Sequence, residues 1–158
     1  MTHQQIRGAE WPHEWVEGEA HELTPSHRAA SLPLLLGRAI FGGYFLYNGI
    51  NHFMHHDMMA GYAKMKGVPS AEVAVPGTGV LLVLGGLSLI TGYRPKLGAA
   101  LITTFLAGVS PKMHAFWAES DPQQRQTEMV NFLKNMALIG GAMLAAAEPQ
   151  PSPYSAAA

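Results

Sequence analysis

The chain has 158 residues, of which 48% are hydrophobic and only 13% are charged, whereas a typical soluble domain carries about 25% charged residues. Its formal net charge of -1, without a block of Lys and Arg, excludes a surface that follows nucleic-acid phosphates, so we expect no nucleic-acid partner. The absence of cysteine excludes disulfides, thiolate metal sites and dithiol redox relays, and the low charge indicates one domain embedded in lipid.

The N-terminal residues 1–31 are polar, with two tryptophans and five glutamates. They are too poor in aliphatic residues to build a core, so we expect a separate tail that serves association with a partner and not membrane insertion. The chain then becomes apolar from Leu32 to Asn51. A helix of about 20 residues crosses a hydrocarbon core of about 30 Å, so this stretch is the first expected span.

The middle of the chain predicts a short surface helix followed by two spans. Met58, Met59, Tyr62 and Met65 lie at helical spacing, as expected for an interfacial amphipathic helix. Residues 73–92 contain no charged side chain and form the second expected span. A charged connector at 93–96 keeps it antiparallel to a third span over 97–117, where Pro111 and Lys112 predict a kink or an early end.

The last third of the chain predicts one more span. Residues 118–129 are polar, and an apolar stretch follows from about Val130 to Ala147. Prolines stop any helix in the tail at 148–158. The sequence therefore predicts an all-α, integral membrane four-helix bundle over 32–147, with a short interfacial helix between spans one and two and a polar tail at each end.

Small residues recur four apart in three of these spans. The ladders are Ala39 and Gly43; Ala100, Thr104 and Gly108; Ala137, Gly141 and Ala145. Such ladders let helix backbones approach closely in lipid. They predict either packing inside the bundle or a face that grips another membrane protein.

Polar side chains at membrane depth concentrate at one end of the predicted bundle. With four spans both tails share one side, so the end of span one, the end of span three and the start of span four share the other. These segments carry Asn48, Asn51, His52, His55, His56, Asp57, Lys112, His114, Trp117, Asn131, Lys134 and Asn135. Unpaired polar groups in lipid are costly, so they either line a common site or reach the headgroup layer.

Two kinds of ligand fit this set of side chains. His52, His55 and His56 stand at helical spacing and, with His114 and Asp57, are weak candidates for a metal or haem site, but nothing fixes a ligand set and we assign no metal. A quinone or lipid headgroup instead needs donors beside an apolar slot. We predict that His52, His114, Lys134 and Asn135 converge on one pocket, with Trp117 or Phe116 as a stacking wall and Phe53 beside the slot.

Several segments together resemble the DoxX family of small bacterial membrane proteins, over about residues 34–147. The resemblance rests on LGRAIFGGYFLYNGINHF, KGVP, LLVLGGLSLITGYRPKLGA, MHAFW and NFLKNMALIGG, in that order. It implies a four-span bundle in the bacterial inner membrane, multi-pass, with both termini cytoplasmic. The family takes its name from a membrane subunit of a thiosulfate:quinone oxidoreductase, and other members are linked to redox or assembly roles.

The resemblance also indicates which residues match the family's motifs. A polar residue after glycine in span one corresponds to His52, a His-x-Phe-Trp motif to His114, Phe116 and Trp117, and a Lys-Asn pair to Lys134 and Asn135. Many relatives carry a glutamate where this chain has Leu82, and its loss argues against catalysis by this chain alone.

Three functions remain open from the sequence. The first is an accessory subunit of a membrane electron-transfer assembly that offers a quinone- or lipid-sized site. The second is the membrane subunit of a quinone-linked oxidoreductase, whose partner supplies the substrate-side cofactor. The third is a purely structural or assembly protein. All three predict the lipid bilayer and other membrane protein subunits as partners.

Overall fold

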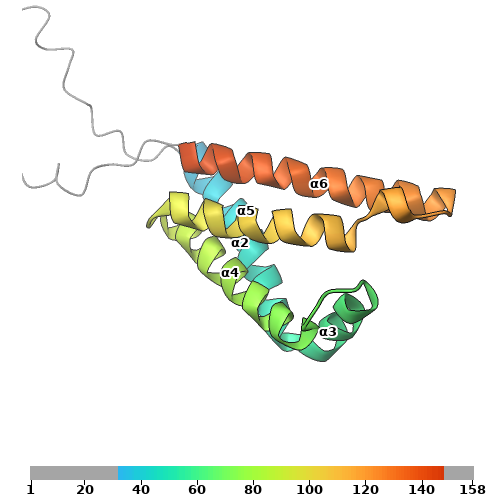
Figure 1. The fold of residues 1–158 in the computed structure, drawn as a ribbon. Helices are drawn as coiled ribbons and strands as arrows, with labels where there is room; N and C mark the ends of the chain where they lie inside the picture. Colours follow the sequence, from blue (N-terminus) through green and yellow to red (C-terminus); the bar gives the residue numbers. More distant parts are fainter. Residues whose placement is uncertain (1–31, 148–158) are drawn as a thin grey trace, which may run out of the picture.

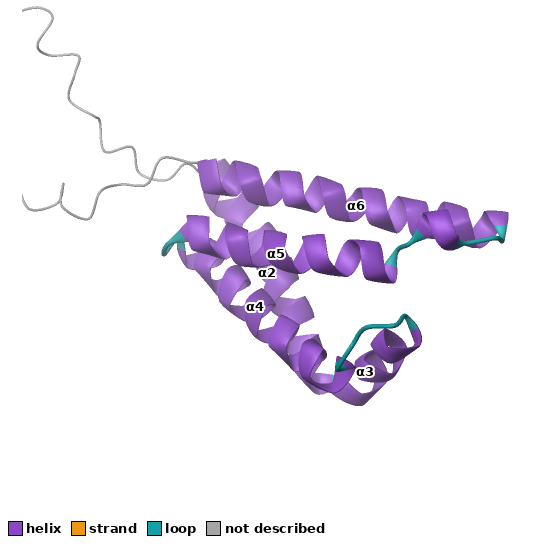
Figure 2. Ribbon diagram, viewed as in Figure 1, coloured by secondary structure: helices purple, strands orange, loops and turns teal. Residues whose placement is uncertain are grey.

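The computed structural model describes residues 32–147, and every regular element within that range is a helix (Figure 1). The expectations for the tails at 1–31 and 148–158 lie outside the described residues. The elements are α2 (Leu32–Met54), α3 (His56–Met65), α4 (Ala71–Thr91), α5 (Pro95–Met113), the 3-10 turn η1 (Phe116–Ala118) and α6 (Pro122–Ala147). Only short loops join them (Figure 2).

Local sequence explains where these helices begin and end. Gly67 and Gly92 adopt φ of 74° and 71°, the left-handed conformation that ends α3 and α4. Pro95 begins α5. Asp121 accepts a hydrogen bond of 2.8 Å from the backbone of Gln124, which caps α6 just before Pro122.

The helix boundaries confirm some expectations and correct others. The third apolar stretch ends as a helix at Met113, two residues after Pro111, and not at Trp117. The segment at 118–129, expected to be a polar connector, instead contains the first turns of α6, which begins at Pro122. This difference matters because it places Glu128 on a helix face and not in a loop.

The four long helices pack in the order α2, α4, α5, α6, with α3 against the start of α4. The start of α2 and the end of α6 lie at one end of the bundle, and α3 and η1 lie at the other (Figure 1). The α2–α4 pair and the α5–α6 pair diverge toward the α3 end. The main core lies where the pairs meet and consists of Phe45, Leu82, Leu89, Ala99, Ile102, Leu106 and Ala142.

The closest contacts between helices lie at glycines, but these glycines are not members of the predicted ladders. A Cβ on Gly86 of α4 would lie 2.6 Å from the carbonyl oxygen of Gly42 in α2. By contrast, a Cβ on Gly43 or Gly108 would meet nothing within 4 Å, whereas one on Gly141 would meet Phe41 of α2. The ladders of α2 and α5 therefore face outward, so internal packing is the wrong interpretation for those two.

The outer surface of the helices is apolar. Its exposed large side chains include Leu36, Ile40 and Tyr47 of α2, Val80, Leu84 and Leu87 of α4, and Leu133, Met143 and Leu144 of α6. By length and hydropathy, α4 and α6 are the two helices of the described part that qualify as membrane spans. So many exposed large apolar side chains are typical of helices in contact with lipid.

Candidate functional site

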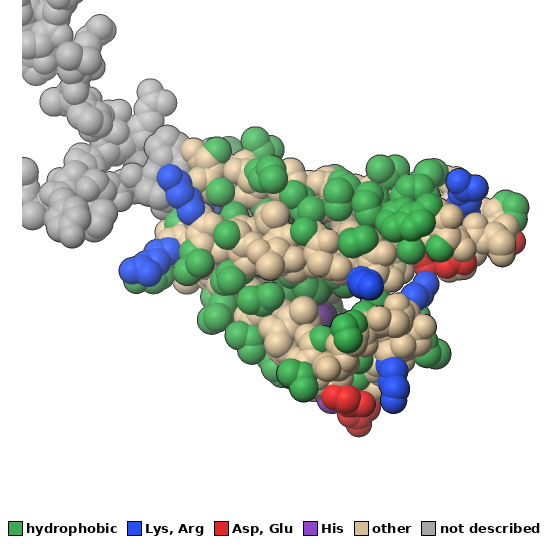
Figure 3. Space-filling model, in the orientation of Figure 1, with side chains coloured by type: hydrophobic (Ala, Val, Ile, Leu, Met, Phe, Trp, Pro, Cys, Tyr) green, Lys and Arg blue, Asp and Glu red, His purple; other side chains and the backbone are tan. Residues whose placement is uncertain are grey.

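A cavity of about 220 Å³ lies between α2, α5 and α6, and Tyr62 of α3 also lines it. Its apolar walls include Phe45 of α2, Phe105, Leu106 and Val109 of α5, and Leu138 of α6. Its polar lining consists of Tyr44, Asn48, His52, Tyr62, His114, Lys134 and Asn135. Figure 3 shows this hollow between the α3 region and the α5–α6 edge, with histidine inside it.

The four side chains that the sequence singled out as headgroup ligands all line this cavity. His52 comes from α2, His114 from the residue that ends α5, and Lys134 and Asn135 from α6. Their convergence follows from the alternating direction of the long helices along the chain. The helices α2 and α5 run the same way and α6 runs back, so the ends of α2 and α5 and the first half of α6 lie at one end of the bundle. The geometry is the one expected, and binding itself stays a prediction.

His52 is held by α4. Its Nδ1 lies 3.0 Å from the carbonyl oxygen of Val75 and 3.1 Å from Oγ1 of Thr78. Because a carbonyl oxygen only accepts, Nδ1 carries the proton and donates to Val75. The ring packs edge-on against Phe105 with centroids 5.8 Å apart, which fixes the orientation of Nε2.

His114 is held by a buried acid, Glu128. Its Nδ1 donates to the carboxylate of Glu128 over 2.7 Å, and Glu128 is only 4% exposed. Since Nδ1 is occupied by this bond, Nε2 is the nitrogen of His114 left for a ligand. The pair is therefore a positioned imidazole beside the cavity, with its orienting carboxylate behind it.

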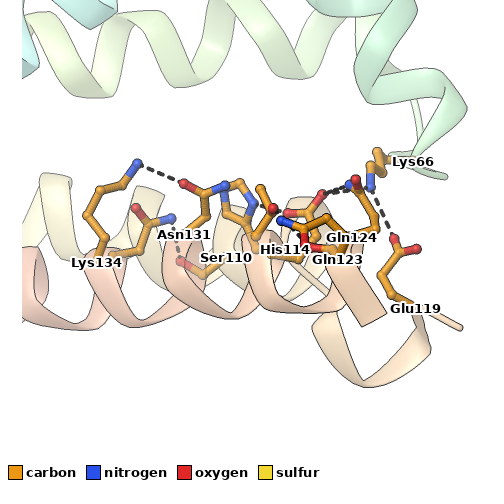
Figure 4. A network of polar contacts seen from close by, with 11 residues as sticks. Lys66, Ser110, His114, Glu119, Gln123, Gln124, Asn131 and Lys134 are labelled. Atoms are coloured by element: carbon orange, nitrogen blue, oxygen red, sulfur yellow. Dashed lines mark hydrogen bonds and ion pairs between the residues drawn. The ribbon is translucent and has the colours of Figure 1, made fainter. Parts of the chain in front are cut away.

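The other oxygen of Glu128 links Lys66, at the end of α3, to α6, in the polar network where Figure 4 labels Lys66 and Gln124. It accepts from Gln124 Nε2 at 3.0 Å and lies 3.5 Å from the Lys66 amine, which also lies 3.8 Å from Glu119. Burial lowers the pKa of Lys66, but the nearby Tyr62, Glu128 and Glu119 more than offset it, and the net pKa is raised. The amine is therefore charged at neutral pH.

Two amide and amine groups of α6 complete the polar lining. The Asn135 amide donates to Oγ of Ser110 in α5 over 3.1 Å, and both residues are buried. The Lys134 amine donates to Oδ1 of Asn131 over 3.3 Å, one turn away on the same helix. Figure 4 shows the Lys134 side chain extending away from its helix before it reaches that amide.

The aromatic walls differ from those expected. Trp117 is 55% exposed and packs with Phe116 and Phe132 in a cluster around η1 that does not line the cavity. Phe53 packs against Gly79 of α4, also outside the cavity. The early end of α5 turns the 116–118 segment away, so Phe105 and Tyr62 take the place of the predicted stacking wall.

The histidines do not gather into a metal site in the described part of the chain, where no group of three His, Cys, Asp or Glu side chains converges. His56 bonds to Asp57 and to the Glu72 carbonyl, whereas His52 and His114 bond to different helices. Exposed His55 has no place in the cavity lining. The spacing at 52, 55 and 56 instead lets α2 and α3 make two separate bonds to α4.

Sequence reasoning missed Glu128 because it placed this residue in a loop. Once α6 is known to begin at Pro122, the polar residues Gln124, Glu128, Asn131 and Asn135 fall at spacings of four, three and four. That pattern is one face of a helix, and it was readable in the sequence. Leu82, at the position where the resemblance implied a glutamate in many relatives, is fully buried in the main core.

Comparison with known proteins identifies one family. The family model for DoxX matches residues 33–115, which is more than half of the chain. No curated protein and no solved structure matches the chain. On this evidence, together with its apolar helices, the chain belongs to the DoxX family and is a helical membrane protein.

Proposed function

We propose that this chain is an accessory subunit of a membrane electron-transfer assembly and that its cavity holds the headgroup of a quinone or lipid. The observation that carries the proposal is the convergence of His52, His114, Lys134 and Asn135, from three helices, on one apolar-walled cavity. The resemblance to DoxX proteins supports a place in the bacterial inner membrane, with both termini in the cytoplasm. The chain binds and docks, and a partner carries out the catalysis.

The proposal includes four spans formed by α2, α4, α5 and α6 within a membrane domain over 32–147. The shortest of these, α5, has 19 residues, and at a rise of about 1.5 Å per residue it is about 29 Å long, close to the hydrocarbon thickness. The outward face of α5 carries small residues and the exposed face of α2 is apolar. Both faces are suited to contact with lipid or with a neighbouring helix. The exposed apolar side chains of α3, Met58 and Met65 among them, suit the membrane interface.

The cavity suits a headgroup and not a whole ligand. Pockets for drug-sized molecules measure about 300–1,000 Å³, and this one measures about 220 Å³. An isoprenoid or acyl tail therefore lies outside it along the apolar helix surfaces. Within it, the proposal assigns the bonds to headgroup oxygens to Nε2 of His114, whose Nδ1 is taken by Glu128, and to the Lys134 amine.

Binding of decylubiquinone to the purified full chain in nanodiscs tests the cavity. We expect saturable binding that His114→Leu weakens by about tenfold or more, since a hydrogen bond involving a positioned polar group is worth about 1–2 kcal/mol. His55→Leu, on an exposed histidine outside the cavity, is the matched control. Equal loss in both variants, or no saturable binding by the parent, contradicts the proposal.

Recovery of partners tests the accessory role. Mass spectrometry of the complex purified from native membranes should identify other membrane subunits with redox centres. A quinone-reductase turnover by the purified chain alone would instead favour the second function, a quinone-linked oxidoreductase subunit.

The outward ladders of α2 and α5 favour an assembly function as a further candidate. Replacing Gly43 by Leu would then release the partner without loss of quinone binding.

A further inference from the structure

In the part of the chain that the structure describes, the cavity lining contains a basic side chain but no acidic one. Its ionisable side chains are His52, His114, Lys134 and two tyrosines, and no Asp or Glu lines it among residues 32–147. The lining is therefore rich in hydrogen-bond donors and carries a positive charge at Lys134. A ligand in this cavity would therefore contact the Lys134 cation but no carboxylate of the lining.

The Lys134 ammonium has a neutral partner only. Its hydrogen bond goes to the Asn131 amide at 3.3 Å, and none of the ion pairs within the described range includes Lys134. An ammonium has three donors, so at least two remain for a ligand. At membrane depth a charge without a counter-charge is costly, and such groups pair with an anion when one is available.

The one acid of α6 already has other partners. Glu128 lies six residues before Lys134, and its two oxygens are occupied by His114 at 2.7 Å, Gln124 at 3.0 Å and Lys66 at 3.5 Å. It is 4% exposed and does not line the cavity. The counter-charge for Lys134 is therefore not supplied by Glu128.

We infer that the cavity selects an amphiphile with an anionic headgroup, a carboxylate or a phosphate, over a neutral one of the same size. This inference rests on the proposed function and names the ligand class of its cavity. Lys134 supplies the counter-charge, and the apolar walls, Phe105 and Leu138 among them, contact the carbon atoms next to the headgroup before the tail leaves the cavity. The same chemistry comes from two sources, a free fatty acid and an acidic phospholipid of the bilayer.

A pair of ligands that differ only in headgroup charge tests the selectivity. Decanoate and decanol carry the same chain, and we expect decanoate to bind the full-length protein in phosphatidylcholine nanodiscs about tenfold more tightly, as a charge-assisted hydrogen bond implies. Lys134→Met should remove this preference, and Lys134→Arg should keep it. Lys112→Met is the matched control, since Lys112 is exposed near the end of α5 and does not line the cavity.

The two sources are separated by the lipid of the nanodisc. Replacing part of the zwitterionic phosphatidylcholine by anionic phosphatidylglycerol should displace decanoate if an acidic phospholipid is the natural occupant, and should leave its binding unchanged if a free carboxylate is. Either result supports an anionic headgroup.

Equal binding of decanoate and decanol, or a preference that survives Lys134→Met, overturns the inference. If decylubiquinone still binds in that case, the proposed cavity function stands and only the charge preference is lost. If none of the three ligands binds, the proposed function fails as well.

Discussion

His56 supplies a hydrogen-bond donor that a proline removes from α4. Pro76 lies inside α4 and has no N–H, so the carbonyl oxygen of Glu72, one turn earlier, lacks its helical donor. His56 Nε2 lies 3.0 Å from that oxygen, and its Nδ1 lies 3.0 Å from the Asp57 carboxylate. Both partners only accept, so both ring nitrogens donate and the protonated imidazole fits best.

This arrangement predicts a pH-dependent attachment of α3 to α4. The bond to the Glu72 carbonyl, followed by that to Asp57, raises the pKa of His56 above its ordinary 6.5. A raised pKa means that the contribution to stability is complete below about pH 6.5 and is lost as pH rises through the folded-state pKa. Hydrogen exchange at the start of α4 should therefore increase with pH more steeply than its intrinsic dependence, and His56→Ala should abolish the excess. His55→Ala, one residue away, should retain it.

At the scale of elements, the α2–α4 contact depends on two glycines that face each other. A Cβ on Gly86 would meet backbone atoms of Gly42 and Leu46 at 2.6 and 2.7 Å, and backbone does not yield as a flexible side chain does. Close approach of this kind gives helices in lipid their packing energy. The contact lies beside Phe45, so any shift also disturbs the main core.

Replacing Gly86 by Ala should destabilise the bundle by about 1–3 kcal/mol, the usual cost of overpacking. Gly43→Ala is the matched control, because its Cβ would meet open space and alanine favours a helix by about 0.5–1 kcal/mol over glycine. Thermal unfolding in detergent measures both. A Gly86→Ala variant as stable as the Gly43→Ala variant would show that the helices separate freely.

A second element-scale contact holds α3 against α6. Lys66, at the end of α3, bonds to Glu128 and Glu119, and it is the polar link between the two diverging helix pairs at that end (Figure 4). Glu128→Ala should destabilise the protein by about 1–3 kcal/mol, since it leaves the partly buried His114 without its acceptor and Lys66 with only the longer contact to Glu119. Glu119→Ala, on the longer and more exposed contact, should cost less than about 1 kcal/mol. Urea unfolding of the two variants side by side provides the comparison. An equal loss in the free energy of unfolding would contradict the central role of Glu128 in the network.

For the whole molecule, the antiparallel order of the long helices predicts that residues 66–70 and 119–121 face one side of the membrane and 92–94 the other. Single cysteines at the exposed positions Pro69, Ser120 and Tyr93 are suitable because the chain has no cysteine of its own. In sealed vesicles a membrane-impermeant maleimide should label Pro69→Cys and Ser120→Cys together, and Tyr93→Cys only after permeabilisation, or the reverse. Labelling of Pro69→Cys and Tyr93→Cys from the same side would contradict the crossing of α4.

The sequence by itself determined the all-helical character, the positions of α2, α3 and α4, and the polar set that meets at one end, because hydrophobic runs and charge-free stretches are local properties of the chain. It also led to the DoxX family, through the order of its motifs. It did not determine the bounds of α5 and α6. The helix α5 ends soon after Pro111, inside the apolar stretch, and α6 begins after the cap at Asp121, inside a polar stretch that hydropathy assigns to a connector.

Only the tertiary structure decided which polar groups serve the cavity and which serve packing. His52 and His56 look alike in the sequence, but one lines the cavity and the other completes a proline-interrupted helix. Glu128 joins His114 only because α6 runs back along α5 and removes the carboxylate from water. Such partnerships depend on distances between helices, which no local pattern of residues contains, and they leave Lys134 as the cavity's cation.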